Sequence, residues 1–159
     1  MSDARQSSPP QPAVEDFTFV DAAWNLRQSY RADPLLAPFF EALRNRRLLG
    51  VRDPGAGRVL FPPRSLSEES FAQLQELVPV GPSGVIRTLT QVPGGKGGRP
   101  PLTVVFVQLD GADAAAAGHL RGAGADTDDL LALVGRRCRA VFKDAPEGAW
   151  TDFWYELEG

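Results

Sequence analysis

The chain has 159 residues, of which 43% are hydrophobic, which is enough to bury one good core together with a smaller appendage. Its formal net charge of -3 and isoelectric point near 5.2 give no general attraction to polyanions, which weighs against a general nucleic-acid-binding protein. The single cysteine excludes an intrachain disulfide framework and favours a reducing compartment. Since no apolar run approaches the ~20 residues of a transmembrane helix and the N-terminus lacks a secretory signal pattern, we expect a cytoplasmic protein.

The N-terminal part of the chain divides into a polar tail and a patterned segment. Residues 1–15 are rich in proline and serine and contain almost nothing to bury, which predicts a disordered tail. Residues 16–47 are predicted to hold a short strand at 17–20, where β-favouring residues gather, followed by a helix.

The helix is predicted to begin at Asp33 and Pro34, because Asp accepts hydrogen bonds from first-turn amides and proline is tolerated at the first helical position. Pro38 fits this helix only if it lies within about the first turn. Apolar residues at three- and four-residue spacing form one face, namely Leu35, Leu36, Phe39, Phe40 and Leu43. This face has two interpretations: it packs in the core, or Phe39 or Phe40 packs into a partner protein.

Residues 48–71 have the framework of a small zinc ribbon. A Pro-Gly turn separates the apolar runs 48–51 and 59–61, which predicts a hairpin. The outer positions of two tight turns are Asp53 and Ala56 in the first and Ser67 and Ser70 in the second, with ten residues between the pairs. A closed zinc site needs Cys or His at such positions, so we expect no zinc and assign 48–78 to a degenerate, metal-free ribbon.

The segment after the second turn carries a helical pattern. Phe71, Leu74 and Leu77 recur at helical spacing, and Ser67 and the acidic residues that follow it can cap a helix N-terminus. In an intact ribbon the metal would fix this turn. Here it must be held by a partner or by the packing of Leu48, Val51, Leu60 and Phe61.

Residues 79–159 carry the pattern of a β domain. Five strand candidates are separated by Pro- and Gly-containing turns and by one acidic segment, 126–133, that is compatible with a helix; the strands are 85–92, 102–109, 114–120, 136–142 and 150–157. This pattern favours a five-stranded Greek-key OB barrel. The predicted fold class is therefore mainly β, with an N-terminal helix, a degenerate metal-free zinc ribbon and an OB-fold barrel.

Three apparent chemical motifs do not support an independent enzyme. The glycine-rich segment 94–98 lacks a Ser or Thr after its lysine, and the following prolines prevent a phosphate-binding helix, so a hairpin loop is favoured. His119 is the only histidine and has no nucleophile arranged around it, which favours a structural or surface role. Cys138 lies in a predicted strand in phase with Ala140 and Phe142, which favours a small core residue.

Residues 39–71, FFEALRNRRLLGVRDPGAGRVLFPPRSLSEESF, resemble the start of the bacterial and archaeal zinc-ribbon/OB-fold accessory proteins that accompany thiolase-type enzymes. In that family a helix leads to Cys-x-x-Cys-Gly, an apolar strand, Pro-Pro-Arg and a second Cys-x-x-Cys. This chain departs at all four cysteines and keeps Gly57, Pro62, Pro63, Arg64 and Phe71. The resemblance continues in order through 81–92, 100–122, 133–142 and 151–157.

The resemblance implies a non-catalytic accessory subunit. Such a subunit binds a thiolase-fold acyltransferase or aldolase, which carries the catalytic residues, and helps form or cover its acyl-CoA site. The partner-interface candidates are then Phe39, Phe40, Phe61 and Pro63, and the candidates for CoA phosphate contacts are Arg44, Arg64 and Arg87. The lost zinc ligands have two interpretations, either a partner that holds the ribbon in place or a changed role; the retained Pro-Pro-Arg favours the first.

The alternative from another class is an OB-fold protein that binds single-stranded nucleic acid through a basic groove with stacking aromatics. Its support is a cluster of basic and aromatic residues, Arg136, Arg137, Arg139, Trp150, Phe153, Trp154 and Tyr155. The acidic isoelectric point and the need for some of these aromatics in the core count against it.

Overall fold

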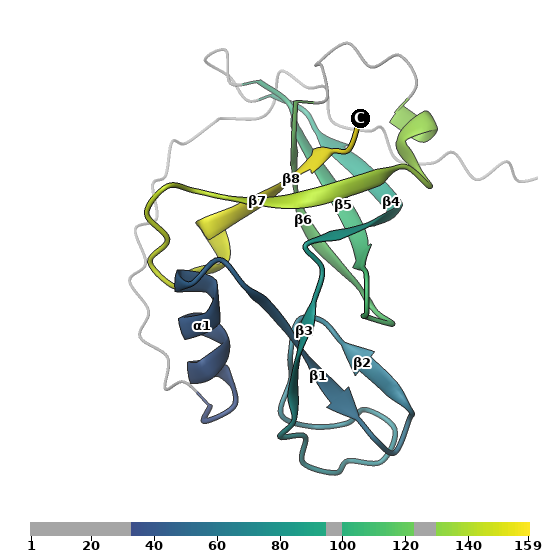
Figure 1. Cartoon of the computed structure of the whole chain (residues 1–159). Coiled ribbons are helices and arrows are strands. Elements are labelled where there is room, and N and C mark those ends of the chain that lie inside the picture. The colour runs from purple at the N-terminus through teal and green to yellow at the C-terminus, as the bar shows by residue number, and fades with distance from the viewer. Residues whose placement is uncertain (1–32, 95–99, 123–129) are drawn as a thin grey trace, which may run out of the picture. The chain divides into compact units, whose positions relative to one another are not determined.

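The computed structural model describes residues 33–94, 100–122 and 130–159 (Figure 1). The predicted tail 1–15, the predicted strand 17–20, most of the glycine-rich loop 94–98 and the start of the acidic segment 126–133 lie outside these residues. None of the helices in the described part of the chain is both long and apolar enough to cross a membrane.

The described chain begins with one helix, α1 (Leu36–Arg44). Asp33 stands before it, where its side-chain Oδ1 accepts a hydrogen bond from Leu35 N at 2.8 Å. Pro38 is the third helical residue, so its missing amide falls in the first turn and removes no intrahelical hydrogen bond. The helix packs against β1 (Leu48–Asp53) through its buried face, which includes Phe39 and Leu43.

A three-stranded antiparallel sheet follows, with the strand order β2-β1-β3. β1 pairs with β2 (Arg58–Leu60) as the predicted hairpin, with Val51 opposite Leu60, and with β3 (Leu77–Val80), with Leu48 opposite Val80. The helix predicted after the second turn is wrong, because residues 71–76 are irregular and Leu77 starts β3. The mostly buried central strand β1 takes a second neighbour, and this long-range pairing overrides the local spacing.

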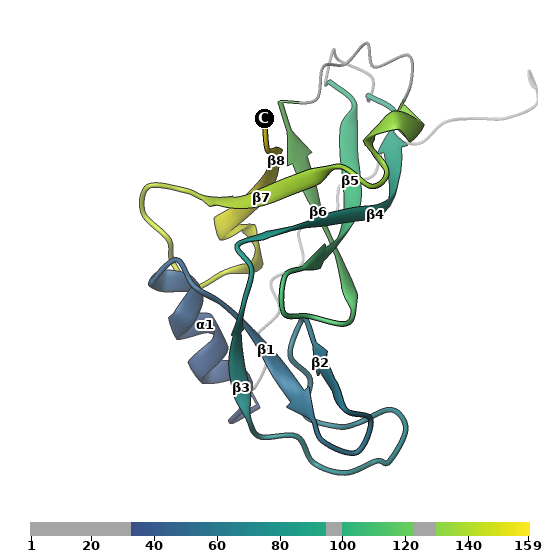
Figure 2. The same cartoon turned by 45° about the vertical axis from the view of Figure 1, so that its right-hand side comes forward.

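The rest of the chain closes into a five-stranded barrel with the order β4-β5-β6-β8-β7 (Figure 2). Four of the five neighbouring pairs are antiparallel, and β6 and β8 are parallel. A short 3₁₀ helix, η2 (Leu130–Leu133), precedes β7, and another, η3 (Trp150–Asp152), forms the first part of the last predicted strand. The strands are β4 (Ser83–Val92), β5 (Leu102–Leu109), β6 (Ala115–Arg121), β7 (Arg137–Phe142) and β8 (Phe153–Leu157).

The predicted fold class is confirmed: the chain is mainly β, with one N-terminal helix, a small three-stranded sheet and a closed five-stranded barrel. One core cluster runs from Phe39 and Leu43 of α1 through Phe61 to the barrel interior around Val105 and Tyr155. A second, smaller cluster joins Leu35, just before α1, to the ribbon residues Val51, Leu60 and Leu74.

Candidate functional site

The loop between β7 and β8 is organised around the buried carboxylate of Asp152. Its Oδ2 accepts hydrogen bonds from the amides of Glu147, Gly148 and Ala149 at 2.9, 2.6 and 2.8 Å, and its Oδ1 lies 2.8 Å from Lys143 Nζ. Burial alone would raise the pKa of Asp152, but the Lys143 ion pair and the three amides lower it to about 2. The loop is therefore held in one conformation, which positions the adjacent Trp150.

The C-terminal end of α1 is tied to this same loop. Arg44 Nε donates to Glu147 O at 2.9 Å, and Arg46 Nη2 donates to Asp144 O at 2.8 Å. Gly148 has φ of +81°, and a Cβ atom there would lie 2.8 Å from Phe40 O. A glycine is needed at this position both for the backbone conformation and for the close approach of the helix.

An aromatic cluster forms where the helix and the loop meet. The ring of the fully buried Phe39 lies 5.5 Å from Phe40, 6.3 Å from Phe61 and 4.8 Å from Trp150, measured between ring centroids. Trp150 is 45% exposed and Phe40 is half-buried, so these two rings carry the cluster to the surface. Large aromatic side chains in such positions are favoured anchors for protein partners.

A cleft of about 300 Å³ lies beside Trp150. It lies between β6 and the η3–β8 segment, which pair as parallel strands at Leu120 and Arg121. Its wall includes Pro62, the β6 segment around His119, and Trp154. Arg121 lies over Trp154 with 3.8 Å from its Cζ to the ring centroid, and burial followed by the charge of Arg121 lowers the pKa of His119. The cleft thus offers aromatic surfaces, one cation and a neutral imidazole.

The four predicted interface residues differ in their exposure to solvent. Phe39, Phe61 and Pro63 are buried in the chain's own packing, so for Phe39 the interpretation as a core residue applies, and Phe40 alone of the four is half-exposed. Sequence reasoning missed the contribution of Trp150 to this surface, because it assigned this residue to a strand. A tryptophan that follows the charged, glycine-containing loop at 144–149 was the one feature of the sequence that indicated a surface aromatic residue here. The buried Asp152 that positions Trp150 could not be inferred from the local sequence pattern.

The three predicted CoA-contact arginines come from three different elements. Arg44 uses Nε for Glu147 O and pairs Nη1 with Glu41 at 2.8 Å, at the end of α1. Arg64, in the loop after β2, pairs with Glu68. Arg87, on β4, is exposed and donates from Nε to Gln108 Oε1 at 2.8 Å. The described structure does not bring these three side chains into one shared contact.

The basic and aromatic residues of the alternative function are also divided. Arg137 forms a two-point contact with Asp110, with Nη1 and Nη2 at 2.9 and 2.6 Å from its oxygens, and a longer contact with Glu158. Tyr155 is fully buried in the barrel. The core prediction for Cys138 is confirmed, because it is fully buried and burial raises the pKa of its thiol to about 11.

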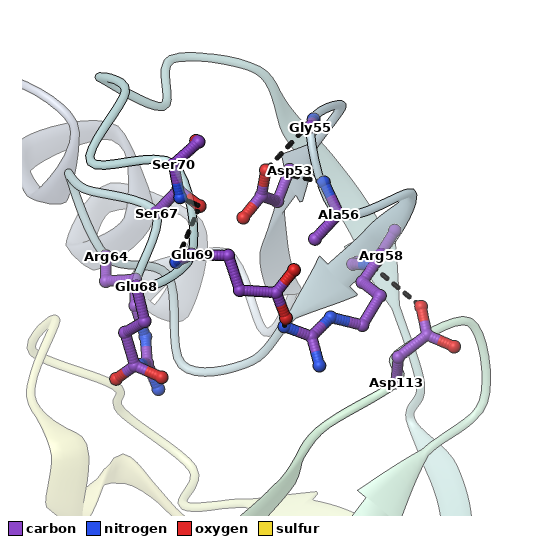
Figure 3. Close-up of polar contacts among 11 residues, drawn as sticks. Asp53, Gly55, Ala56, Arg58, Arg64, Ser67, Glu68, Glu69, Ser70 and Asp113 are labelled. Carbon is purple, nitrogen blue, oxygen red and sulfur yellow. Dashed lines mark hydrogen bonds and ion pairs between the residues drawn. The ribbon is translucent and has the colours of Figure 1, made fainter.

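The two ribbon turns are closed by side-chain oxygens (Figure 3). Asp53 Oδ1 accepts hydrogen bonds from the amides of Gly55 and Ala56 at 3.1 and 3.2 Å. Ser67 Oγ accepts from the amides of Glu69 and Ser70 at 3.3 and 3.2 Å. Asp53 and Ser67 are each 1% exposed. Each turn is therefore fixed locally by its own first residue.

The residues at the ribbon corners do not fit the zinc ion of the resembling family. The corners Asp53, Ala56, Ser67 and Ser70 supply no thiolate and no imidazole, and one of them has no donor atom in its side chain at all. Among residues 33–94, 100–122 and 130–159, no group of three or more His, Cys, Asp and Glu side chains could hold a metal ion.

Comparison with known proteins gives structural relatives but no sequence relatives. No protein-family model matches the sequence, and no curated protein is significantly similar to it. A protein of unknown function from the DUF35 family of Sulfolobus solfataricus matches with a TM-score of 0.60 and 16% identity, over 79% of this chain and 86% of that chain. The Ltp2-ChsH2(DUF35) aldolase matches with a TM-score of 0.56 and 17% identity, over 81% and 97%. The chain therefore has the fold seen in DUF35 proteins.

Proposed function

We propose that this protein is a non-catalytic accessory subunit that binds a thiolase-fold acyltransferase or aldolase and helps form or cover its acyl-CoA site. The observation that carries the proposal is the match to the Ltp2-ChsH2(DUF35) aldolase, which takes in both the ribbon sheet and the barrel, since it covers 81% of this chain. The sequence resemblance to accessory proteins of thiolase-type enzymes points the same way and rests on other observations, namely the order of short motifs.

The surface around Trp150 supports a protein partner. Trp150 and Phe40 are held by a rigid loop and a tethered helix, so binding would cost little ordering of their side chains. The adjacent cleft of about 300 Å³ gives this surface a concave part that can receive a side chain or part of a ligand.

The state of the potential nucleophile agrees with catalysis by the partner. The Cys138 thiol is buried with a raised pKa, so it is neither accessible nor ionised at neutral pH. In this proposal the partner supplies the catalytic residues, as the resemblance implies. Arg64 and Arg87 stay candidates for CoA phosphate contacts, whereas a contact from Arg44 would compete with its hydrogen bonds to Glu147 and Glu41.

The experiment is a mild affinity purification of the tagged chain from its native cytoplasm, followed by reconstitution with the protein recovered. We expect a stoichiometric thiolase-fold protein whose activity on an acyl-CoA substrate increases when the chain is added. Trp150→Ala should weaken the complex about tenfold or more, because an exposed aromatic anchor typically contributes 1–2 kcal/mol or more.

The matched control is Leu131→Ala, which removes an apolar side chain that is 78% exposed on η2. This variant should bind the partner as the wild type does. Because Trp150 also packs on Phe39, the melting temperature of each variant is measured alongside. Recovery of the chain alone, or together with nucleic acid, would contradict the proposed function.

A further inference from the structure

The interior of the ribbon contains a carboxylate oxygen with an unusual environment. Asp53 is 1% exposed, and its Oδ1 is used by the amides of its own turn. Its Oδ2 is buried and has no hydrogen-bond partner among the described residues. An unpaired buried charge is costly, so a nearby donor is expected to serve it.

The hydroxyl of Ser67 is a donor in a position to serve it. Figure 3 shows an oxygen of Asp53 directed toward Ser67, which lies on the second turn and is equally buried. Ser67 Oγ accepts two amides but still has its own proton to donate. The Ser67 hydroxyl is also the largest cause of the lowered pKa of Asp53; burial opposes it by raising the pKa, and the amides of Ala56 and Gly55 lower the pKa further.

We propose that a hydrogen bond from the Ser67 hydroxyl to Asp53 Oδ2 is the link between the two ribbon turns, at the place where the resembling family holds zinc. Two of the residues at the former zinc-ligand positions then hold the two turns of the ribbon together without a metal ion. Asp53 closes the first turn through Oδ1, and Ser67 closes the second turn through the lone pairs of Oγ. The proposed hydrogen bond from the Ser67 hydroxyl to Asp53 Oδ2 joins the two turns. This inference does not depend on the proposed function.

The surface contact between the turns is a weaker candidate for this role. Arg58 and Glu69 form an ion pair across the turns, but their side chains are 45% and 58% exposed. Exposed ion pairs contribute little because water and salt screen them. The buried contact is not screened in this way, so it should dominate the coupling.

The test measures amide hydrogen exchange of the full chain by NMR in a buffer with EDTA. Ser67→Ala removes the hydroxyl, and we expect the exchange of the Gly55 and Ala56 amides, on the opposite turn, to become about tenfold faster, as for the loss of a charge-assisted hydrogen bond. Ser67→Cys keeps the volume and a weak donor and should give a smaller effect. Glu69→Ala removes the surface ion pair and should leave these two amides unchanged.

Two results would overturn the proposal. If Ser67→Ala affects only the amides of Glu69 and Ser70, the turns are closed independently. If Glu69→Ala accelerates Gly55 and Ala56 as much as Ser67→Ala does, the surface ion pair is the link. A separate thermal-unfolding series with zinc chloride or EDTA should leave the melting temperature of the wild-type chain unchanged, and stoichiometric zinc binding with a higher melting temperature would refute a metal-free ribbon.

Discussion

Replacing Asp152 by alanine should be among the most destabilising single changes in this protein. The substitution leaves three backbone amides and the Lys143 ammonium without the acceptor that they share in a site with 0% exposure. Losing a side chain that caps backbone amides costs about 1 kcal/mol on average, and each buried amide left without any acceptor costs about 1–3 kcal/mol. We therefore expect a loss of about 3–5 kcal/mol, a large share of the ~5–15 kcal/mol that stabilises a typical domain.

The assay is urea denaturation followed by circular dichroism, with the midpoint and slope fitted separately. Asp152→Asn keeps an acceptor for the amides but removes the charge opposite Lys143, so its loss should be smaller than that of alanine. The control is Glu147→Ala, which removes only an exposed contact to Lys143 at 3.5 Å and should cost less than about 0.5 kcal/mol. If Asp152→Ala and Glu147→Ala have equal effects, the reasoning about the buried carboxylate is refuted.

The Asp152 carboxylate should also make the stability of the folded protein decrease at low pH. Its pKa in the folded protein is about 2, below the value of about 4 expected when unfolded, so the unfolded chain binds the proton more readily. The stabilisation is therefore fully present above about pH 4 and is lost as the pH falls toward 2. Asp152→Asn should flatten this part of the stability profile, and an unchanged acid transition in the variant would contradict the assignment.

Three further predictions concern close packing and burial. Gly118→Ala would place a Cβ 2.8 Å from Cδ2 of the buried Tyr155 ring and should cost about 1–3 kcal/mol in urea denaturation. Gly148→Ala, at φ +81° and against Phe40 O, should cost at least about 1–2 kcal/mol and change the near-ultraviolet signal of the aromatic cluster. The Cys138 thiol should resist a thiol reagent at pH 8 in the folded chain and react fully once unfolded, because burial raises its pKa to about 11; rapid labelling of the folded chain would refute this.

The strands of the barrel were predictable because each of them is marked by a pattern within its own short stretch of sequence. Alternating apolar residues such as those of β5 define a half-buried strand, and Gly and Pro turns mark its ends. β3 was missed because it consists of four residues, contains Pro79, and is held by pairing with β1, which lies well before it in the chain. The spacing of Phe71, Leu74 and Leu77 imitated a helix, although Phe71 is 80% exposed and has φ of +55°.

The candidate site was less predictable than the fold for a related reason. The sequence marked Phe39 and Phe40 as an apolar face but could not decide between core and surface, since that depends on what covers them. The covering groups are Phe61 and Trp150, which come from distant parts of the chain. Trp150 in turn owes its place to hydrogen bonds within residues 147–152, and no local pattern identifies Asp152 as a buried acceptor rather than a surface charge.

The two core clusters explain why a ribbon of this kind can dispense with its metal. The cluster between the ribbon and the segment before α1 has four buried apolar residues, which is too few to hold a separate domain. The ribbon is, however, joined to the turn between β5 and β6 by a pair of hydrogen bonds, from Val59 N to Asp113 Oδ2 and from Asp113 N to Val59 O, each 2.8 Å. The base of the ribbon is thus fixed by the barrel, and only the two turns at its tip need a further link. An Asp53–Ser67 contact is sufficient for that smaller task, whereas an isolated ribbon would need the whole binding energy of a zinc ion.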